Sequence, residues 1–114
     1  MEKQFNVKKK RCVYATYYIV SYKYGKIELW IEDKNPKELF LCNLLVQPPE
    51  RKKGIGQLLL NYSEEAAHKL GFKRIALKVL KDSWMEKWYK RNGYIEDYIW
   101  DEEERIVKYL HKDI

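Results

Sequence analysis

The chain has 114 residues, enough for one domain around one core, and its 46% hydrophobic and 15% aromatic content excludes an intrinsically disordered protein. No apolar run approaches the length of a membrane span and the N-terminus has no secretory-type hydrophobic segment, so a cytoplasmic protein without membrane contact is expected. The net charge of +6 favours an anionic partner such as nucleic acid, an acidic protein or a phosphorylated cofactor, although solvated surface cations account for most of it.

The first half of the chain is predicted to form strands. Residues 4–8 fit a short edge strand, and residues 12–22 are rich in β-branched and aromatic side chains. Residues 26–32 alternate between apolar and polar side chains, as a strand with one buried face does, and the preceding Tyr24-Gly25 marks a turn. Residues 38–46 are almost continuously apolar, which predicts a central strand covered on both faces.

A helix is predicted from about Gly54 to Leu70, with Gly71 as its stop. Its apolar residues fall at helical spacing: Ile55, Leu58, Leu59, Tyr62, Ala66 and Leu70. Residues 74–80 follow as an alternating, β-branched strand.

A second helix follows, for which Asp82 or Ser83 can supply the N-cap and which Asn92-Gly93 ends. Its predicted apolar stripe consists of Trp84, Met85, Trp88 and Tyr89. Residues 94–100 and 106–111 are predicted to form a final hairpin around the acidic turn 101–104. The whole order predicts a single α/β domain over residues 1–114, with a mixed sheet and some α+β character.

The cysteines and histidines do not indicate a metal site. Cys12 and Cys42 lack metal-type spacing, and His68 and His111 have no cysteine partner at zinc spacing. Both thiols are interpreted as reduced core or near-core residues.

A glycine motif stands before the first predicted helix, in the segment Arg51-Lys52-Lys53-Gly54-Ile55-Gly56. It lacks the Lys-Ser/Thr pair of a Walker A loop and the third glycine or alanine of a dinucleotide-binding fingerprint. A helix N-terminus with two glycines and three cations nevertheless suits an anion, because free N–H groups and the helix dipole face it. Taken locally, the segment is either an anion site or an ordinary helix start.

Two blocks together resemble a known family. Val46 to Gly56, VQPPERKKGIG, is similar to the V-x-P-x-x-R-x-x-G-x-G signature of the GNAT superfamily of N-acetyltransferases. Trp88 to Tyr94, WYKRNGY, resembles the family's x-Y-x-x-x-G-F element one strand and one helix later. The resemblance covers about residue 26 to the C-terminus and implies a GNAT-like fold with splayed central strands, two main helices and acetyl-CoA as acetyl donor.

The resemblance also implies where acetyl-CoA binds. The pantetheine would lie along the backbone of Leu44 to Val46, and the pyrophosphate on the N–H groups of Arg51 to Gln57. The implied cofactor-binding residues are Leu44, Leu45, Val46, Arg51, Lys52, Lys53, Gly54, Ile55, Gly56, Gln57 and Asp82.

The resemblance assigns the chemistry to two groups. The Val46 N–H is the family-like donor to the oxyanion, and Tyr89 is the general acid that protonates the leaving thiolate. The alternative for Tyr89 is a core aromatic on an apolar stripe.

Three positions depart from the family pattern. Asp82 stands where many members have asparagine, Met85 replaces a small residue, and Phe40 stands where some members have a glutamate base. The base could be Glu32, a residue of the acidic turn, a water chain, or absent.

The N-terminal part has no credible helical pattern, whereas family members usually have two helices there. We therefore expect an open acceptor side that admits a bulky primary amine, such as a protein lysine or N-terminus, or that a second subunit completes in a homodimer. The expected function is acetyl-CoA-dependent N-acetylation of a protein or small-molecule amine by direct attack on the thioester. The alternatives are a non-catalytic acyl-CoA-binding module and, ranked below it, a basic nucleic-acid binder, which leaves both motifs unexplained.

Overall fold

The computed structural model describes residues 5–48, 54–103 and 105–114. Along these residues the chain forms β1 (Asn6–Arg11), β2 (Ala15–Tyr22), β3 (Gly25–Glu32), β4 (Leu39–Val46), α1 (Ile55–Lys69), β5 (Arg74–Leu80), α2 (Trp84–Arg91), β6 (Ile95–Glu102) and β7 (Arg105–Asp113). The element order predicted from the sequence is confirmed. The first strand is β1, which starts later and runs further than predicted, and β2 begins at Ala15 rather than at Cys12.

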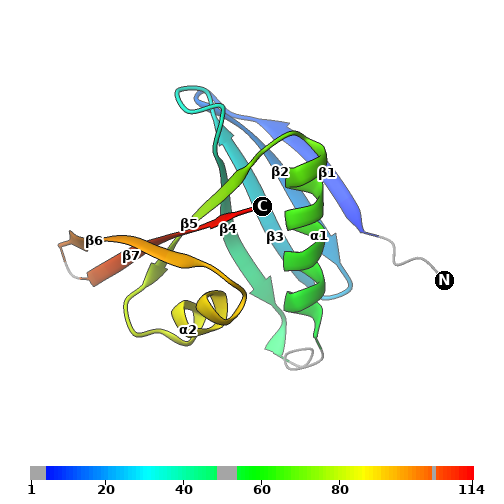
Figure 1. The fold of residues 1–114 in the computed structure, drawn as a ribbon. Helices are drawn as coiled ribbons and strands as arrows, with labels where there is room; N and C mark the ends of the chain where they lie inside the picture. The colour runs from blue at the N-terminus through cyan, green and yellow to red at the C-terminus, as the bar shows by residue number, and fades with distance from the viewer. Residues whose placement is uncertain (1–4, 49–53, 104) are drawn as a thin grey trace.

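All seven strands join one sheet in the order β1-β2-β3-β4-β5-β7-β6 (Figure 1). Neighbouring strands are antiparallel except β4 and β5, which are parallel and are connected through α1. A parallel pair needs a crossover connection, and a helix provides it here. The predicted mixed α/β class is therefore confirmed.

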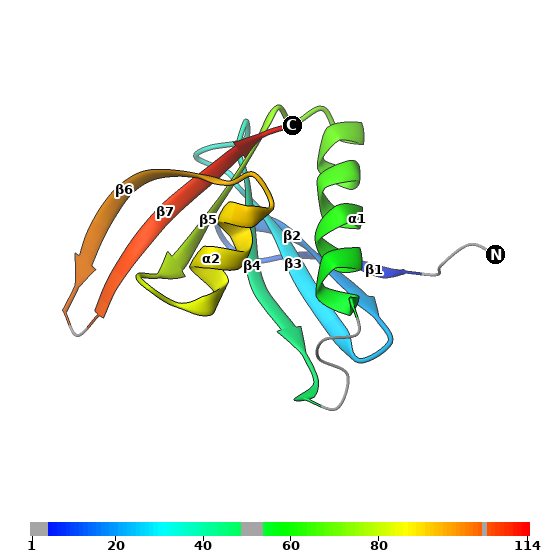
Figure 2. The same cartoon turned by 60° about the horizontal axis from the view of Figure 1, so that its bottom comes forward.

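Both helices of the described residues lie on the same face of the sheet (Figures 1 and 2). The hydrophobic core fills the space between them and the strands, with β-strand residues such as Ile27, Leu29 and Ile75 facing Leu59 and Leu60 of α1. The opposite face of the sheet, which we call the bare face, carries no helix from this part of the chain. The N-terminal segment forms strands and no helix in the described residues, as its pattern predicted, and the role of the bare face as an open acceptor side stays a prediction.

The apolar run in β4 results from a β-bulge and not, as predicted, from coverage of the strand on both faces. Asn43 has a φ of 54° and forms a β-bulge, because the pairing with β3 shifts by one residue at this point. An extra residue exchanges the two faces of a strand, so Leu39 and Leu41 before the bulge and Leu44 after it all pack on the helix side. The predicted coverage of this strand on both faces is wrong, since its other residues lie on the bare face.

Gly25 is not the turn residue that the sequence predicted. The turn consists of Lys23, whose φ is 52°, and Tyr24, as predicted for Tyr24, whereas Gly25 is already the first residue of β3, paired with Val46. A Cβ on Gly25 would lie 2.8 Å from Ile55 Cγ2 and 3.0 Å from Leu59 Cδ1. The missing side chain therefore allows the first turn of α1 to approach the sheet closely.

Replacing Gly25 with alanine is expected to destabilise the fold by about 1–3 kcal/mol, because the new methyl group overpacks the contact with α1. Urea denaturation monitored by circular dichroism measures this loss. Gly56→Ala is the matched control, since its Cβ would meet only ordinary contacts at 3.9 Å. Equal stability of the Gly25→Ala variant and the parent chain would contradict this explanation.

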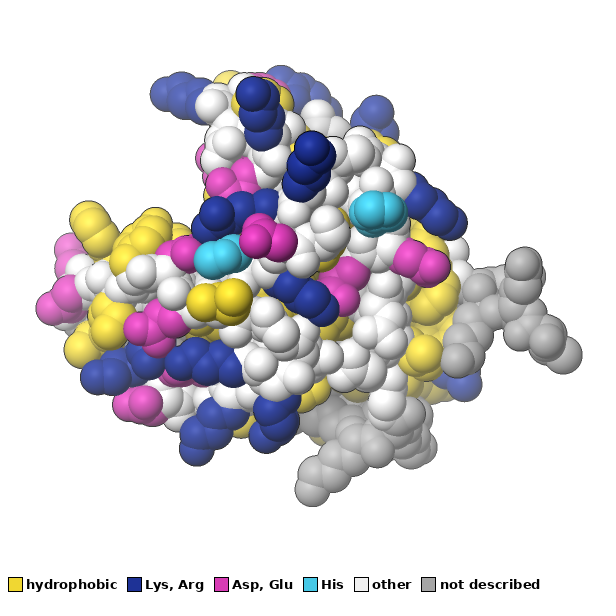
Figure 3. All heavy atoms as spheres, in the orientation of Figure 1, with side chains coloured by type: hydrophobic (Ala, Val, Ile, Leu, Met, Phe, Trp, Pro, Cys, Tyr) yellow, Lys and Arg dark blue, Asp and Glu magenta, His cyan; other side chains and the backbone are white. Residues whose placement is uncertain are grey.

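The β6–β7 hairpin extends beyond the helices and exposes apolar side chains. Figure 3, which looks onto the helix-covered face, shows hydrophobic side chains gathered over this hairpin at the left of the view. Ile95, Ile99 and Ile106 are among the exposed hydrophobic residues of these two strands. None of the described helices has the length and apolar character that crossing a membrane requires.

Candidate active site

A cleft opens where the two central strands separate. β4 and β5 pair only from Leu39 to Leu41, opposite Ile75 to Leu77, and then diverge. The resulting cleft has a volume of about 440 Å³. The residues that line it come from β4, β5 and α2: Leu41, Cys42, Asn43, Leu44, Leu77, Lys78, Val79, Leu80, Ser83, Trp84, Met85 and Tyr89.

Tyr89 is the most deeply buried residue that α2 contributes to this cleft, with 3% of its surface exposed. Its ring packs edge-on against Tyr94 and Trp88, at centroid distances of 5.3 and 4.9 Å. No residue among 5–48, 54–103 and 105–114 hydrogen-bonds its hydroxyl group. Burial, reinforced by Cys42 and Glu64, raises the pKa of this phenol above its ordinary value, so the hydroxyl is protonated at neutral pH.

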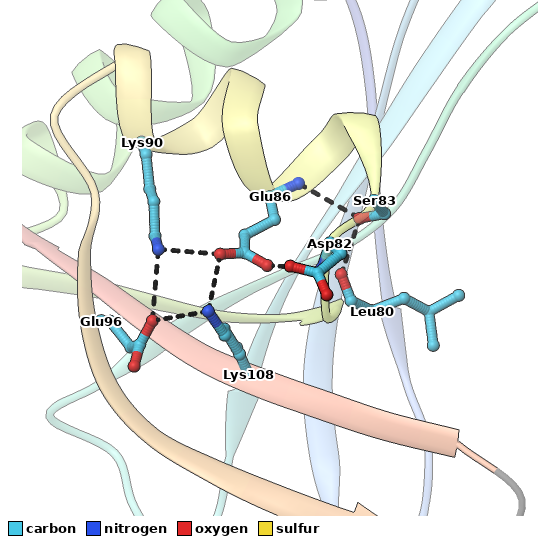
Figure 4. Close-up of polar contacts among 7 residues, drawn as sticks. All are labelled: Leu80, Asp82, Ser83, Glu86, Lys90, Glu96 and Lys108. Carbon is cyan, nitrogen blue, oxygen red and sulfur yellow. Dashed lines mark hydrogen bonds and ion pairs between the residues drawn. The ribbon is translucent and has the colours of Figure 1, made fainter.

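Ser83 rather than Asp82 caps α2. The Ser83 hydroxyl accepts a hydrogen bond from the Glu86 N–H at 3.2 Å and donates one to the Leu80 carbonyl at 2.7 Å (Figure 4). Asp82 precedes the cap with a φ of 63° and is exposed. It does not line the cleft, so its predicted cofactor contact stays a prediction.

Glu86 anchors α2 to the final hairpin. Its buried carboxylate lies 2.7 Å from Lys90 and 3.0 Å from Lys108, and accepts a hydrogen bond from the Asp82 N–H at 2.7 Å (Figure 4). Glu96 completes the network by pairing with both lysines. Burial opposes ionisation, but these contacts outweigh it and lower the pKa of Glu86 to about 2. The predicted apolar stripe is wrong in part, because Glu86 takes an inner position while Trp84 is 68% exposed.

The N-terminus of α1 lies beside α2. The first intrahelical hydrogen bond runs from the Leu58 N–H to the Gly54 carbonyl, which leaves the preceding N–H groups of the helix outside its ladder. Gly54 has a φ of 80°, and a Cβ there would meet no described atom within 4 Å. The Gln57 side chain donates to Asn92 at 2.8 Å and so connects the two helices. Arg51, Lys52 and Lys53 lie outside the described residues.

A second pocket, of about 460 Å³, lies on the bare face. Aromatic residues from four parts of the chain line it: Tyr14, Trp30, Phe40 and Tyr109. It shares five lining residues with the cleft, namely Leu41, Cys42, Asn43, Leu77 and Lys78. We call these five residues the junction, because they border both spaces at the place where β4 and β5 separate.

Cys42 stands at the junction with its thiol held protonated. Burial raises its pKa to about 11, with further contributions from the negative charges of Glu28 and Glu32 that Lys78 opposes only in part. A thiol is a nucleophile only as thiolate, so Cys42 is unreactive at neutral pH.

Two carboxylates of β3 belong to the bare face. Glu28 is buried, and its Oε1 accepts hydrogen bonds from Trp30 Nε1 at 2.8 Å and from Asn43 Nδ2 at 3.0 Å. Glu32 lines the bare-face pocket. Glu32 is one of the bases considered from the sequence and Glu28 is not, although the alternation of residues 26–32 places both on one face.

The structure brings some predicted site residues together and not others. Leu44 and Tyr89 line the same cleft. Val46 lies next to the first turn of α1, with its Cγ2 3.9 Å from the place that a Cβ on Gly56 would take. Met85 also lines the cleft, whereas Phe40 lies in the bare-face pocket. Leu45 is exposed and lines neither space.

Comparison with known families identifies the class of this protein. Residues 14–94 match the model of the acetyltransferase (GNAT) family. The match covers more than half of the chain, including the cleft, the junction and Tyr89, so the chain belongs to this family. A search of curated proteins finds no match.

Solved structures share the fold at low sequence identity. A Bacillus subtilis acetyltransferase in complex with CoA is 18% identical, with a TM-score of 0.73 over 97% of this chain and 99% of its own. The ribosomal-protein-S18-alanine N-acetyltransferase of Escherichia coli is 16% identical, with a TM-score of 0.71 over 91% of this chain and 72% of its own. A GNAT family acetyltransferase from Elizabethkingia anophelis with acetyl-CoA bound is 16% identical, with a TM-score of 0.70 over 88% and 76%.

Proposed function

We propose that the protein is an acetyl-CoA-dependent N-acetyltransferase that acetylates a primary amine by direct attack on the thioester. The observation that carries the proposal is the separation of β4 and β5, where a cleft containing Tyr89 and a pocket on the bare face share five lining residues. In this arrangement a donor and an acceptor would meet from opposite faces of the sheet. Family membership and the CoA and acetyl-CoA complexes of two structural neighbours support the same reading.

The chain's groups fit the donor. The apolar cleft suits the pantetheine arm, which would run along the β4 edge from Leu44 to Val46. The N-terminus of α1 suits the pyrophosphate, because its N–H groups lie outside the helix ladder and the space at Gly54 is open to the described atoms. By sequence, Arg51, Lys52 and Lys53 place three cations next to that helix end. Acetyl-CoA supplies the activated acetyl group when bound.

Tyr89 would act at the leaving group. The amine nitrogen forms a bond to the thioester carbonyl carbon, the C–S bond breaks, and the sulfur receives a proton from the Tyr89 hydroxyl. This hydroxyl is protonated at neutral pH, because burial raises its pKa, so it holds the proton that the sulfur would receive. Glu28 lies beside the junction, where its carboxylate can receive the proton that the amine must lose.

The state of Cys42 favours direct attack over an acetyl-cysteine intermediate. In a Cys12→Ser background, alkylation of Cys42 by iodoacetamide at pH 8 is expected to be about 100-fold slower than that of free cysteine, whose pKa is about 8.5. Because the pKa is about 11, the rate should rise with pH up to pH 10 without a plateau. Mass spectrometry of timed samples measures this, and a plateau near pH 9 would contradict it.

The function is tested by incubating the protein with isotope-labelled acetyl-CoA and an amine panel, read by mass spectrometry. The panel contains polyamines, aminoglycosides, lysine peptides and peptides with free N-termini. We expect stoichiometric binding of acetyl-CoA by calorimetry and labelled product from at least one amine.

A second outcome would identify a different function. Met85, which lines the cleft in place of a small residue, motivates a module that binds acyl-CoA without catalysis. Binding of acetyl-CoA together with no transfer to any amine would reject the enzyme and support this module. Absence of binding would reject both.

A further inference from the structure

Acidic and aromatic side chains follow one another along β3 on the bare face. The proposed transfer step uses only one of these side chains, that of Glu28. Glu28, Trp30 and Glu32 occupy every second position of this strand and so share a face. The Cα atoms of the two glutamates are four residues of extended strand apart, about 13 Å. Of the two side chains, only that of Glu32 lines the bare-face pocket.

Glu28 is the buried glutamate of the two and lies next to the junction. Glu28 pairs with Cys42 across β3 and β4, and Asn43 donates a hydrogen bond to its Oε1. Both of these partners belong to the junction. Lys26 is the nearest cation, at 3.7 Å from Oε2.

Glu32 has no counterion among the described residues. Its half-buried side chain lines the bare-face pocket, and no side chain of the described ranges pairs with it. Lys78, the other charged residue of this pocket, is already paired with Glu102 at 3.0 Å. The unbalanced charge of the pocket is therefore negative, and partly buried charges usually have a partner.

Aromatic rings stand next to Glu32. The Trp30 ring stacks on Tyr17 at 4.2 Å and on Tyr14 at 6.0 Å, and Tyr14 is 57% exposed. The Glu28 carboxylate fixes the indole through Nε1. Faces of tryptophan and tyrosine attract ammonium and guanidinium groups, so the rings and Glu32 suit the same ligand charge.

We propose that Glu32, Tyr14 and Trp30 form a subsite for a second positive charge of the acceptor, while the reacting amine lies at the junction beside Glu28. The acceptor is then an elongated dication, either a polyamine-type molecule or a basic peptide. Glu32 does not touch the reacting atoms and acts as a positioning residue. This inference rests on the proposed function and names its substrate class.

The test uses linear α,ω-diamines from butanediamine to dodecanediamine, each with the monoamine of equal length. Tryptophan fluorescence without acetyl-CoA measures binding, and steady-state acetylation measures turnover. Affinity and kcat/KM should pass through a maximum at one diamine length, because the two charges would be bound at two fixed places of the sheet. Monoamines should show no such maximum.

Glu32→Gln is expected to raise the KM and the dissociation constant of the preferred diamine about 10-fold, because a charge-assisted contact is lost. The kcat, the affinity for acetyl-CoA and all monoamine values should stay unchanged. Glu65→Gln is the matched control, since it removes the same charge from an exposed position of α1. Tyr14→Leu should weaken the same diamine about threefold.

Peptides distinguish the two sources of the dication. A peptide with two lysines is compared with the peptide in which norleucine replaces one of them. Loss of the advantage on norleucine substitution indicates a basic peptide, and preference for free diamines indicates a polyamine. Equal values for all diamine lengths, or a Glu32→Gln variant that matches the parent, would overturn the subsite. If no amine is acetylated, the proposed function fails, while the fluorescence series still decides whether the subsite exists.

Discussion

Replacing Tyr89 with phenylalanine is expected to lower kcat about 100-fold, the usual range for a lost general acid. The affinity for acetyl-CoA, measured by calorimetry, should change less than twofold, because the ring remains in the cleft wall. Stability should also stay close to that of the parent, since none of the described residues hydrogen-bonds this hydroxyl. Stopped-flow detection of the released CoA thiol measures the rate.

Tyr94→Phe is the matched control for this experiment. Tyr94 belongs to the same ring cluster, but its hydroxyl donates a hydrogen bond to Glu64 at 2.9 Å. This variant should lose about 1–3 kcal/mol of stability, as expected for a hydrogen bond to a charged group, while kcat is retained. A Tyr89→Phe variant with unchanged kcat would reject Tyr89 as the acid and leave it as a core aromatic.

Replacing Glu86 with glutamine is expected to lower the free energy of unfolding at pH 7 by about 2 kcal/mol. Removing one partner of a buried ion pair usually costs about 3–5 kcal/mol, and the solvent access of Lys90 and Glu96 reduces this figure. Among the described residues, the variant leaves Lys108 with Glu96 as its one acidic partner. Urea denaturation at a series of pH values measures the effect.

The pH dependence has a defined sign. The folded pKa of Glu86, about 2, lies below its ordinary value of 4.5, so its contribution is complete above pH 4.5. It is lost as the pH falls from 4.5 towards 2, and the difference between the parent and Glu86→Gln should close over this window. Glu65→Gln should follow the parent throughout. A difference that persists at pH 2 would show that Glu86 acts by packing rather than by charge.

The sequence predicted the elements well where the signals were local. The strand Arg74–Leu80 agrees with the prediction at both ends, and α1 differs from it by about one residue at each end. Gly71 stops the helix as predicted, with a φ of 93° and an N–H bonded to the His68 carbonyl. Helix periodicity and capping depend on neighbours within a few residues, so the sequence displays them directly.

Features that depend on distant partners escaped prediction. The bulge at Asn43 exchanges the two faces of β4 in the middle of the strand. In the sequence, the resulting apolar run looks the same as that of a strand whose two faces are both buried. Gly25 is constrained by Ile55 and Leu59, which follow it by some thirty residues in the sequence. Glu86 pairs with Lys90 on α2 and with Lys108 on the distant strand β7, so its burial could not be read from the helix alone.

For the candidate site, the sequence motifs placed Leu44 and Tyr89 in one cleft, and the role of each residue stays a prediction. Asp82 was misplaced as a possible cap because two adjacent residues both had capping side chains, and only the backbone conformation separates them. The bare-face pocket could not be foreseen from motifs, since its aromatic walls come from four separate parts of the chain.

The junction has a consequence for the order of events in the proposed reaction. The cleft opens on the helix-covered side and the pocket on the other, so each substrate would have its own entrance. Neither substrate would block the departure of the other's product. Spent CoA could therefore leave while the acetylated amine is still bound, and a fresh donor could enter behind it. In this arrangement the sheet separates the entrance of the donor from that of the acceptor, and the two substrates meet at the junction.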